Sequence, residues 1–281
     1  MKMVKKILFG LVAVAAVLSL ASCGIKKDDP EGIIKGTAGN YSVNYKYENA
    51  DTTATYRAYK STTYPHAGGL VKVTFNEADL NNAGSSKFGV IFGYKEETKN
   101  SQRLRDFYIV GLGANGDYYV SKFENVVDIQ AENFGAKTNP VNEGDPKEIM
   151  ITTGGAQNNG ILNSGSLYED TEGNKYAYIW FQAFSNGSAK GSYKIKIGNM
   201  TDTAADNWEK LSDDNKRSTP PAFDTELYTK EITEAFDACT AGQEPQLYTG
   251  VYARVQGTKT LNGKVNFKGD YLEAEDIEPI D

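Results

Sequence analysis

The stretch DFYIVGLGANGDYYVSKF, Asp106–Phe123, distinguishes between two kinds of fold. Within it, Gly111–Gly116 spells G-x-G-x-x-G after an apolar run, which is the pattern of a dinucleotide-binding loop. Such a loop needs a helix after its third glycine, because the helix N-terminus holds the pyrophosphate. Here Tyr118-Tyr119-Val120 follows, and aromatic and β-branched residues favour a strand. With Asn115-Gly116 as a hairpin turn, the stretch predicts two antiparallel strands and no nucleotide site.

Similar runs of alternating apolar and polar residues recur along the chain. This alternation indicates strands that bury one face, and two such sheets should pack face to face to cover those faces. The sequence therefore predicts an all-β fold. The expected strands are Tyr41–Tyr47, Thr53–Tyr59, Leu70–Phe75, Phe88–Tyr94, Phe107–Val110, Tyr118–Phe123, Glu148–Thr152, Tyr176–Phe184, Ser192–Ile197, Gly250–Val255 and Leu261–Phe267.

A polar segment over residues 201–242 interrupts this pattern and carries helical signals. A short helix is expected over Ala204–Leu211, with Trp208 packed inward. A second helix is expected after a cap at Asp224 or Thr225, because the apolar residues that follow are spaced by four, four and three positions. Those apolar residues are Tyr228, Ile232, Phe236 and Cys239.

Three stretches carry a resemblance to a known family. FGVIFGY (Phe88–Tyr94), the stretch Asp106–Phe123 and the closing run Gln246–Ile277 resemble segments of concanavalin A-like lectin and glucanase domains, which include laminin G modules. The resemblance implies a two-sheet antiparallel jelly-roll sandwich over residues 37–278, with a short helical insert at about 201–242. It also implies a binding role for glycans or host and matrix proteins.

The N-terminus has the pattern of a secretory signal peptide. Lys2, Lys5 and Lys6 precede an uncharged apolar run, Ile7–Leu20, which is shorter than the roughly 20 residues that a spanning helix needs. The run ends in Leu20-Ala21-Ser22-Cys23, which resembles the lipobox of bacterial lipoproteins. The resemblance implies cleavage after residue 22 and acylation of Cys23.

An acylated Cys23 would make the lipid bilayer a partner of the chain. Residues 23–36 are charged, contain Pro30 and read as a flexible tether. Gly24, at the position after the cysteine, favours the outer membrane or cell surface by resemblance to Gram-negative sorting rules. The leader and domain together also resemble surface lipoproteins of host-associated spirochaetes.

Composition excludes several function classes. The chain has a formal net charge of −7, and loss of the leader with its three lysines makes it more negative. No basic stripe of the kind that nucleic-acid binders carry is present. After cleavage Cys239 is the only cysteine besides Cys23, so no internal disulfide is expected, and Cys239 is expected to be a buried small apolar residue.

The aromatic run Tyr176–Phe184 is the candidate ligand site. In a strand, Ala177, Ile179 and their same-face neighbours would face a core. The opposite face would present a ladder of flat rings with polar tips, which suits stacking on sugars. The alternative is that this ladder faces the other sheet or lies under the helices of 201–242. The ladder residues are Tyr176, Tyr178, Trp180, Gln182 and Phe184.

No catalytic residues and no metal site are assigned. His66 is the single histidine and has no G-x-S-x-G partner motif, so a loop histidine is favoured. Glu273–Glu278 departs from the E-x-D-x-(x)-E strand motif of jelly-roll glucanases, with Glu275 where aspartate belongs. Two loops, Asn139–Asp145 and Asn199–Asp206, remain candidates for a structural calcium ion, although neither has EF-hand spacing.

The expectation is a membrane-anchored surface lipoprotein that acts as a non-catalytic binding module. Two alternatives remain: a degenerate glycoside hydrolase that uses paired carboxylates, including Glu275, and a structural envelope lipoprotein without a soluble ligand.

Overall fold

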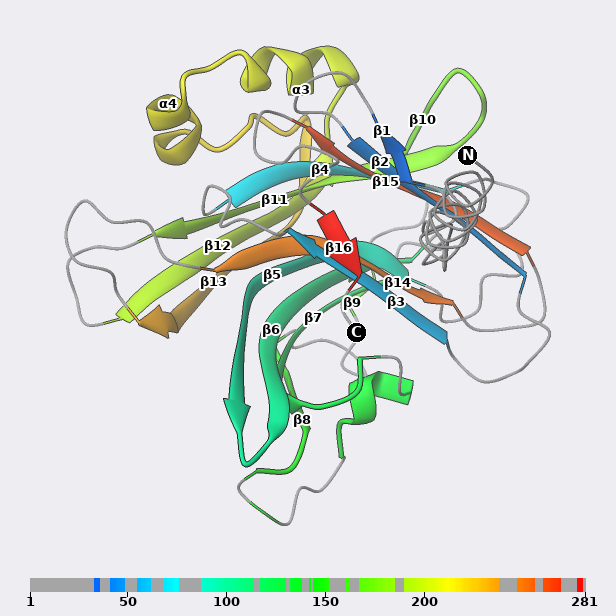
Figure 1. Ribbon diagram of the computed structural model, residues 1–281. Helices are drawn as coiled ribbons and strands as arrows, with labels where there is room; N and C mark the ends of the chain where they lie inside the picture. The colour runs from blue at the N-terminus through cyan, green and yellow to red at the C-terminus, as the bar shows by residue number, and fades with distance from the viewer. Residues whose placement is uncertain are drawn as a thin grey trace, which may run out of the picture.

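Two layers of β-structure make up the protein in the computed structural model (Figure 1). The structure describes residues 33–35, 41–48, 55–61, 68–75, 87–113, 117–129, 132–137, 142, 144–151, 160–161, 167–184, 190–237, 247–255, 260–268 and 277–279. The leader, Cys23, His66, Cys239 and the turn Asn115-Gly116 lie outside these ranges.

Each layer is an antiparallel sheet, and the chain crosses repeatedly between the two. Sheet A has the order β1 (Ile33–Lys35), β2 (Tyr41–Glu48), β15 (Thr260–Lys268), β4 (Gly68–Phe75), β11 (Lys175–Phe184), β12 (Lys190–Asn199) and β13 (Thr225–Asp237), with β10 (Tyr168–Glu169) beside β11. Sheet B has the order β16 (Ile277–Pro279), β3 (Thr55–Ser61), β14 (Tyr248–Val255), β5 (Lys87–Lys99), β6 (Gln102–Leu112), β7 (Asp117–Val126) and β8 (Lys147–Met150), with β9 (Gly160–Ile161) beside β7.

The main core lies between the sheets. Val71, Ile179 and Ile195 from sheet A pack there against Val90 and Val110 from sheet B, and all five are fully buried. A strand lies at each expected stretch, although β8 ends at Met150, and Thr53, Ala54 and Thr152 lie outside the described residues. The two-sheet antiparallel sandwich with a helical insert is confirmed. Period-two alternation succeeds for β4, β5, β6, β11 and β12 because each of these strands turns one face to this shared core.

Both outer faces are also covered in part. The 3-10 helix η1 (Glu132–Gly135) places Phe134 on the outer face of sheet B, against Phe107 and Phe123. On sheet A the helices α3 (Asp202–Glu209) and α4 (Asp213–Ser218) lie over the outer face (Figure 1). Thr201 caps α3 by accepting a hydrogen bond from the Ala204 backbone N–H at 3.2 Å, and Trp208 points inward as expected.

The hairpin prediction for the central glycine motif is confirmed at its two strands. Strand β6 ends at Leu112, β7 begins at Asp117, and the two pair antiparallel with Leu112 opposite Tyr118. A strand therefore stands where a dinucleotide loop would need a helix.

The second helix expected after residue 224 is wrong, because Thr225–Asp237 forms β13. A spacing of four residues is also an even number, so a strand puts Tyr228, Ile232 and Phe236 on one face. These side chains pack on the core between the sheets, and Gly191 of β12 leaves the space that the Phe236 ring occupies. The helical part of the insert is therefore confined to residues 202–218.

Buried tyrosines make the fold sensitive to alkali. Burial raises the pKa of Tyr108 and of Tyr228 to about 12, and it also raises the pKa of Tyr94 and Tyr193. A raised pKa means that the folded state holds the phenolic proton more tightly, so this stabilisation is complete below about pH 10 and is lost as pH rises through about 12. Urea unfolding midpoints should fall across that window, and a midpoint that stays level to about pH 12 would contradict the burial of these rings.

Candidate functional site

The aromatic ladder of β11 is buried. The alternation is as expected, because Ala177, Ile179 and Phe181 belong to the core between the sheets. On the opposite face Tyr178 and Trp180 are fully buried, and most of the other ladder residues are buried as well. Tyr176 and Gln182 are also buried, and Phe184 is half-buried.

The helical insert covers this ladder. Trp208 and Ala205 of α3 pack with Met200 against Tyr178 and Trp180. Exposing a buried ring costs about 1.5–3 kcal/mol. Uncovering Tyr178, Trp180 and Trp208 together would cost roughly 5–9 kcal/mol, comparable with the whole stability of a domain. The expectation of an open glycan platform on the ladder is therefore wrong, and the alternative of a ladder under helices holds.

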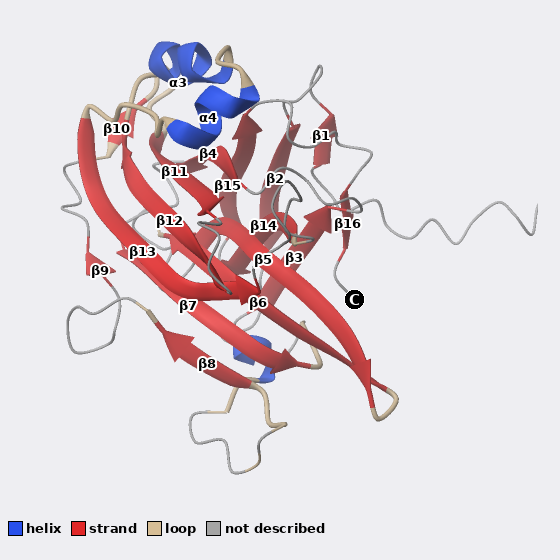
Figure 2. Ribbon diagram, turned by 90° about the vertical axis from the view of Figure 1, so that its left-hand side faces the viewer, coloured by secondary structure: helices blue, strands red, loops and turns tan. Residues whose placement is uncertain are grey.

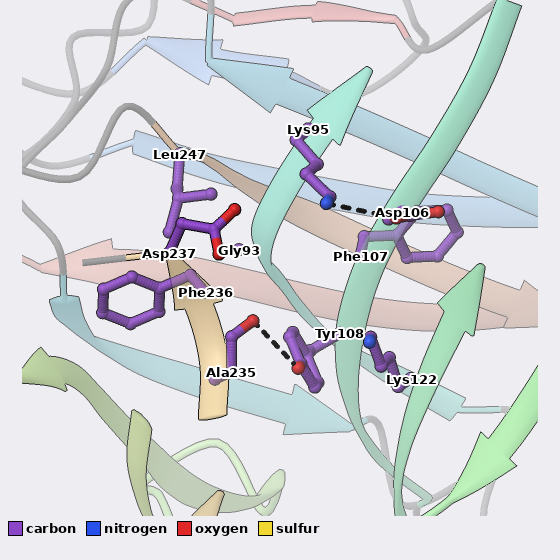
Figure 3. A pocket seen from close by; sticks show the side chains of 10 residues that line it. All are labelled: Gly93, Lys95, Asp106, Phe107, Tyr108, Lys122, Ala235, Phe236, Asp237 and Leu247. Carbon is purple, nitrogen blue, oxygen red and sulfur yellow. Dashed lines mark hydrogen bonds and ion pairs between the residues drawn. The ribbon is translucent and has the colours of Figure 1, made fainter. Parts of the chain in front are cut away.

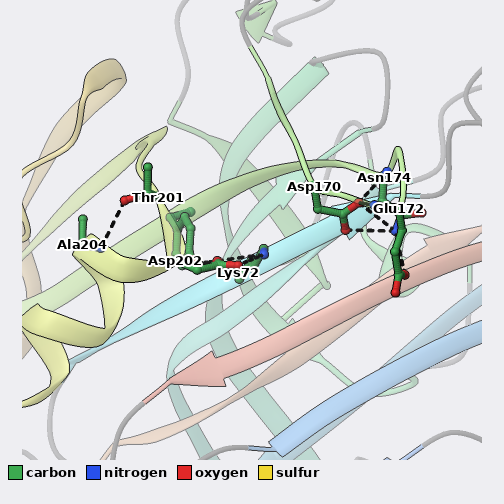
Figure 4. A network of polar contacts seen from close by, with 8 residues as sticks. Lys72, Asp170, Glu172, Asn174, Thr201, Asp202 and Ala204 are labelled. Carbon is green, nitrogen blue, oxygen red and sulfur yellow. Dashed lines mark hydrogen bonds and ion pairs between the residues drawn. The ribbon is translucent and has the colours of Figure 1, made fainter.

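A polar clasp fixes the start of α3 to sheet A (Figure 4). The Lys72 ammonium of β4 donates to both carboxylate oxygens of Asp202, at 2.8 and 2.9 Å, and the Tyr178 hydroxyl donates to the same carboxylate. Lys72 also lies over the Tyr176 ring, 4.0 Å from its centroid. Burial and then the hydrogen bond to Asp202 raise the pKa of Tyr178, so this hydroxyl stays a donor at neutral pH.

Asp202→Ala should loosen the insert. The change leaves the Tyr178 hydroxyl and the largely buried Lys72 ammonium without this acceptor. We expect a loss of about 1–2 kcal/mol in the free energy of unfolding, since half of the Asp202 side chain is exposed to screening solvent. Chemical denaturation measures it, and Asn207→Ala, at an exposed position of the same helix, is the control. Equal midpoints for the two variants would show that the clasp contributes nothing.

A pocket of about 200 Å³ lies between the end of β13 and residues of β5, β6 and β7 (Figure 3). Figure 2 shows the ribbon of β13 in front of these strands of the other sheet. Its inner wall consists of Tyr108 and Phe236, with Leu247 beside them. Lys95, Asp106, Lys122 and Asp237 also line it. The pocket is thus apolar inside and charged around its edge.

A bulge in β5 lies at this pocket, and Gly93 and Lys95 at the bulge line it. The pairing of β5 with β6 shifts between Phe92 and Lys95, and Gly93 there has φ of +60°, which a residue with a side chain rarely adopts. A Cβ at this position would also meet the rings of Tyr108 and Tyr193 at 3.1 Å. Glycine is therefore needed for both backbone and space, and the bulge turns Lys95 to the pocket edge.

The pocket side chains are held by polar contacts. The Tyr108 hydroxyl donates to the Ala235 carbonyl at 3.1 Å, which ties β6 to β13. Lys95 lies 3.4 Å from Asp106, and Lys122 forms an ion pair with Glu124. The Tyr108 ring is thus tied to β13, and both ammonium groups are paired with carboxylates of sheet B.

Asp237 forms an exposed ion pair with Lys190. The Lys190 ammonium donates to the carboxylate, and this hydrogen bond, together with the charge, lowers the pKa of Asp237 below its ordinary value. Lys95 adds to the same lowering of the Asp237 pKa. Asp237 is thus ionised at neutral pH.

The remaining predicted residues do not form a site in the described structure. Asp202, from the proposed calcium loop, serves the clasp, and Asp145 pairs with Lys137 at 2.7 Å. Among the described residues no group of three or more His, Cys, Asp or Glu side chains could hold a metal ion. Glu275 lies outside the described residues, and the backbone of Glu278 belongs to β16.

Sequence reasoning missed the pocket, although one signal pointed to it. Gly93 interrupts the apolar alternation of Phe88–Tyr94, and an isolated glycine within a strand indicates a bulge. The glycine therefore predicts that Lys95 lies beside a bulge in the strand. It says nothing of Asp237, which reaches the pocket from the other sheet.

Comparisons with known proteins add no family. No protein-family model and no curated protein matches the chain. Among the helices of the described ranges, none has the length and apolar character needed to cross a membrane. A functionally unknown protein from Saccharomyces cerevisiae has a solved structure similar to this chain, at 9% identity and a TM-score of 0.30, over 90% of this chain and 93% of that one.

Proposed function

We propose that the protein is a lipoprotein of the outer membrane or cell surface, anchored through acylated Cys23, whose sandwich is a non-catalytic binding module for glycans or host and matrix proteins. The observation that carries the binding role is the pocket at the β5 bulge. Its apolar inner wall and its pre-arranged donors and acceptors are the features that ligand sites share.

The position of the pocket supports this role. Its walls come from strands of both sheets, so the core between the sheets holds them rigid. The tether expected over residues 23–36 is shorter than that, because Ile33–Lys35 forms β1 of sheet A. Residues 23–32 would still leave the domain free to meet ligands beyond the bilayer.

A glycan array and a panel of matrix proteins test the proposal, with the mature acylated chain in nonionic detergent. We expect saturable binding to at least one class. Leu247→Trp, which fills the pocket with a larger side chain, should weaken that binding at least about tenfold. Val127→Trp, at a position that is 41% exposed and does not line the pocket, is the matched control and should bind like the parent chain. Absence of saturable binding on both surfaces would refute the binding role.

A further inference from the structure

Charges of opposite sign lie on opposing walls of the pocket (Figure 3). Lys95 of β5 and Lys122 of β7 stand on the sheet B side, whereas Asp237 ends β13 on the sheet A side. An electric field therefore runs across the pocket from one wall to the other.

The fourth charged side chain of the pocket, Asp106, forms its polar contacts with residues of sheet B. It lies 3.4 Å from Lys95, and its carboxylate also accepts the backbone N–H of Asn125 at 2.9 Å. Two ammonium groups and two carboxylates thus line the pocket, and their charges cancel. A ligand with a net charge gains little from such a site, whereas a ligand that carries both signs can align with the field.

The inner wall of the pocket limits the size of such a ligand and the chemistry of its central part. The rings of Tyr108 and Phe236 line the pocket together with these charged side chains, and Phe236 adjoins Asp237. An aromatic ring beside a carboxylate is a favourable place for an alkylated cation, which gains from the ring face as well as from the charge. At about 200 Å³ the pocket is smaller than the usual range of about 300–1,000 Å³, so the ligand must be compact.

We propose that this pocket binds a compact zwitterionic group, with its anionic end at Lys95 and Lys122 and its cationic end at Asp237 beside Phe236. This assignment rests on the proposed binding function and names the ligand chemistry of its site. Free amino acids, betaines and the phosphocholine headgroup share that chemistry.

Titration calorimetry of the mature acylated chain in nonionic detergent tests the assignment. The zwitterionic probes are phosphocholine, glycine betaine and leucine, and the best binder among them identifies the source. The matched probes are choline as the cation alone, inorganic phosphate as the anion alone, and glucose as a neutral polyol. We expect the best zwitterion to bind at least about tenfold more tightly than choline, phosphate or glucose. Tighter binding of glucose, or of either half alone, would overturn the assignment.

Two variants locate the charges, and one controls for surface charge. Asp237→Asn and Lys122→Met should each weaken binding of the best zwitterion about tenfold or more. Glu231→Gln changes an exposed carboxylate on the same strand, outside the pocket, and should leave affinity unchanged. Unchanged affinity in Asp237→Asn would overturn the proposed orientation.

The outcome also separates this assignment from the broader proposal. Binding on the array or the matrix panel that Leu247→Trp abolishes, without zwitterion binding, would refute the zwitterion alone. A chain that binds neither the surfaces nor any probe would refute both.

Discussion

Replacing Trp180 with alanine is expected to lower the free energy of unfolding by about 3–5 kcal/mol. The side chain is fully buried under α3, among Tyr178, Met200 and Trp208, and its removal leaves a cavity that the short helix cannot close without losing the clasp at Asp202. Because a domain is stable by only about 5–15 kcal/mol, the variant should be close to unfolding at room temperature. Urea denaturation followed by circular dichroism measures the change.

Two further variants make this result specific. Trp180→Phe keeps most of the ring volume and removes an indole N–H that has no hydrogen-bond partner among the described residues, so it should lose less than the alanine variant. Ile149→Ala, at a position on β8 that is 42% exposed, should change stability by no more than about 1 kcal/mol. If Trp180→Ala kept the parent midpoint and only weakened glycan binding, the ladder would be an open platform and the buried position of Trp180 would be refuted.

The ladder of β11 shows that a strand pattern predicts which face each residue lies on but not what covers that face. Alternation assigns Ile179 and Trp180 to opposite faces, and the structure confirms this. The pattern cannot say what lies over the second face, because that depends on where a segment some twenty residues later in the chain packs. Trp208 was the available clue, since a large aromatic residue on a short polar helix needs a surface to cover.

The error over Thr225–Asp237 has a different cause. Spacings of four residues fit a helical face and a strand face equally, so Tyr228, Ile232 and Phe236 do not distinguish the two. The threonines of the segment, including Thr229 and Thr233, favour a strand. Pairing decided the outcome, because β12 offers Ile195 opposite Lys230 and Tyr193 opposite Ile232.

The pocket could not be predicted because its charges meet only in the folded chain. Lys95 of β5 and Lys122 of β7 lie on either side of β6 in sheet B, but Asp237 comes from the edge strand of sheet A. Predicting their meeting requires β13 to be a strand and to lie at the edge of sheet A, facing β6 and β7. The helix expected for that segment would have left the three residues unrelated.

Cys23→Ser should remove the protein from the membrane fraction. In the proposed anchor the acyl chains on Cys23 provide the attachment, at about 0.8 kcal/mol for each buried methylene group, and a serine hydroxyl cannot carry a thioether-linked lipid. Membrane flotation and mass spectrometry of the N-terminal peptide measure the outcome. The parent chain should float and carry a lipid mass on residue 23, and the variant should do neither.

Cys239→Ser is the matched control, because it removes the other cysteine of the chain and leaves the lipobox intact. It should float like the parent chain. The same comparison separates anchoring from folding, since β13 ends two residues before Cys239 and a destabilised domain would still be held by its lipid. A Cys23→Ser chain that still floated would show that attachment comes from elsewhere, and the lipoprotein proposal would fail while the pocket and its ligand remained open to test.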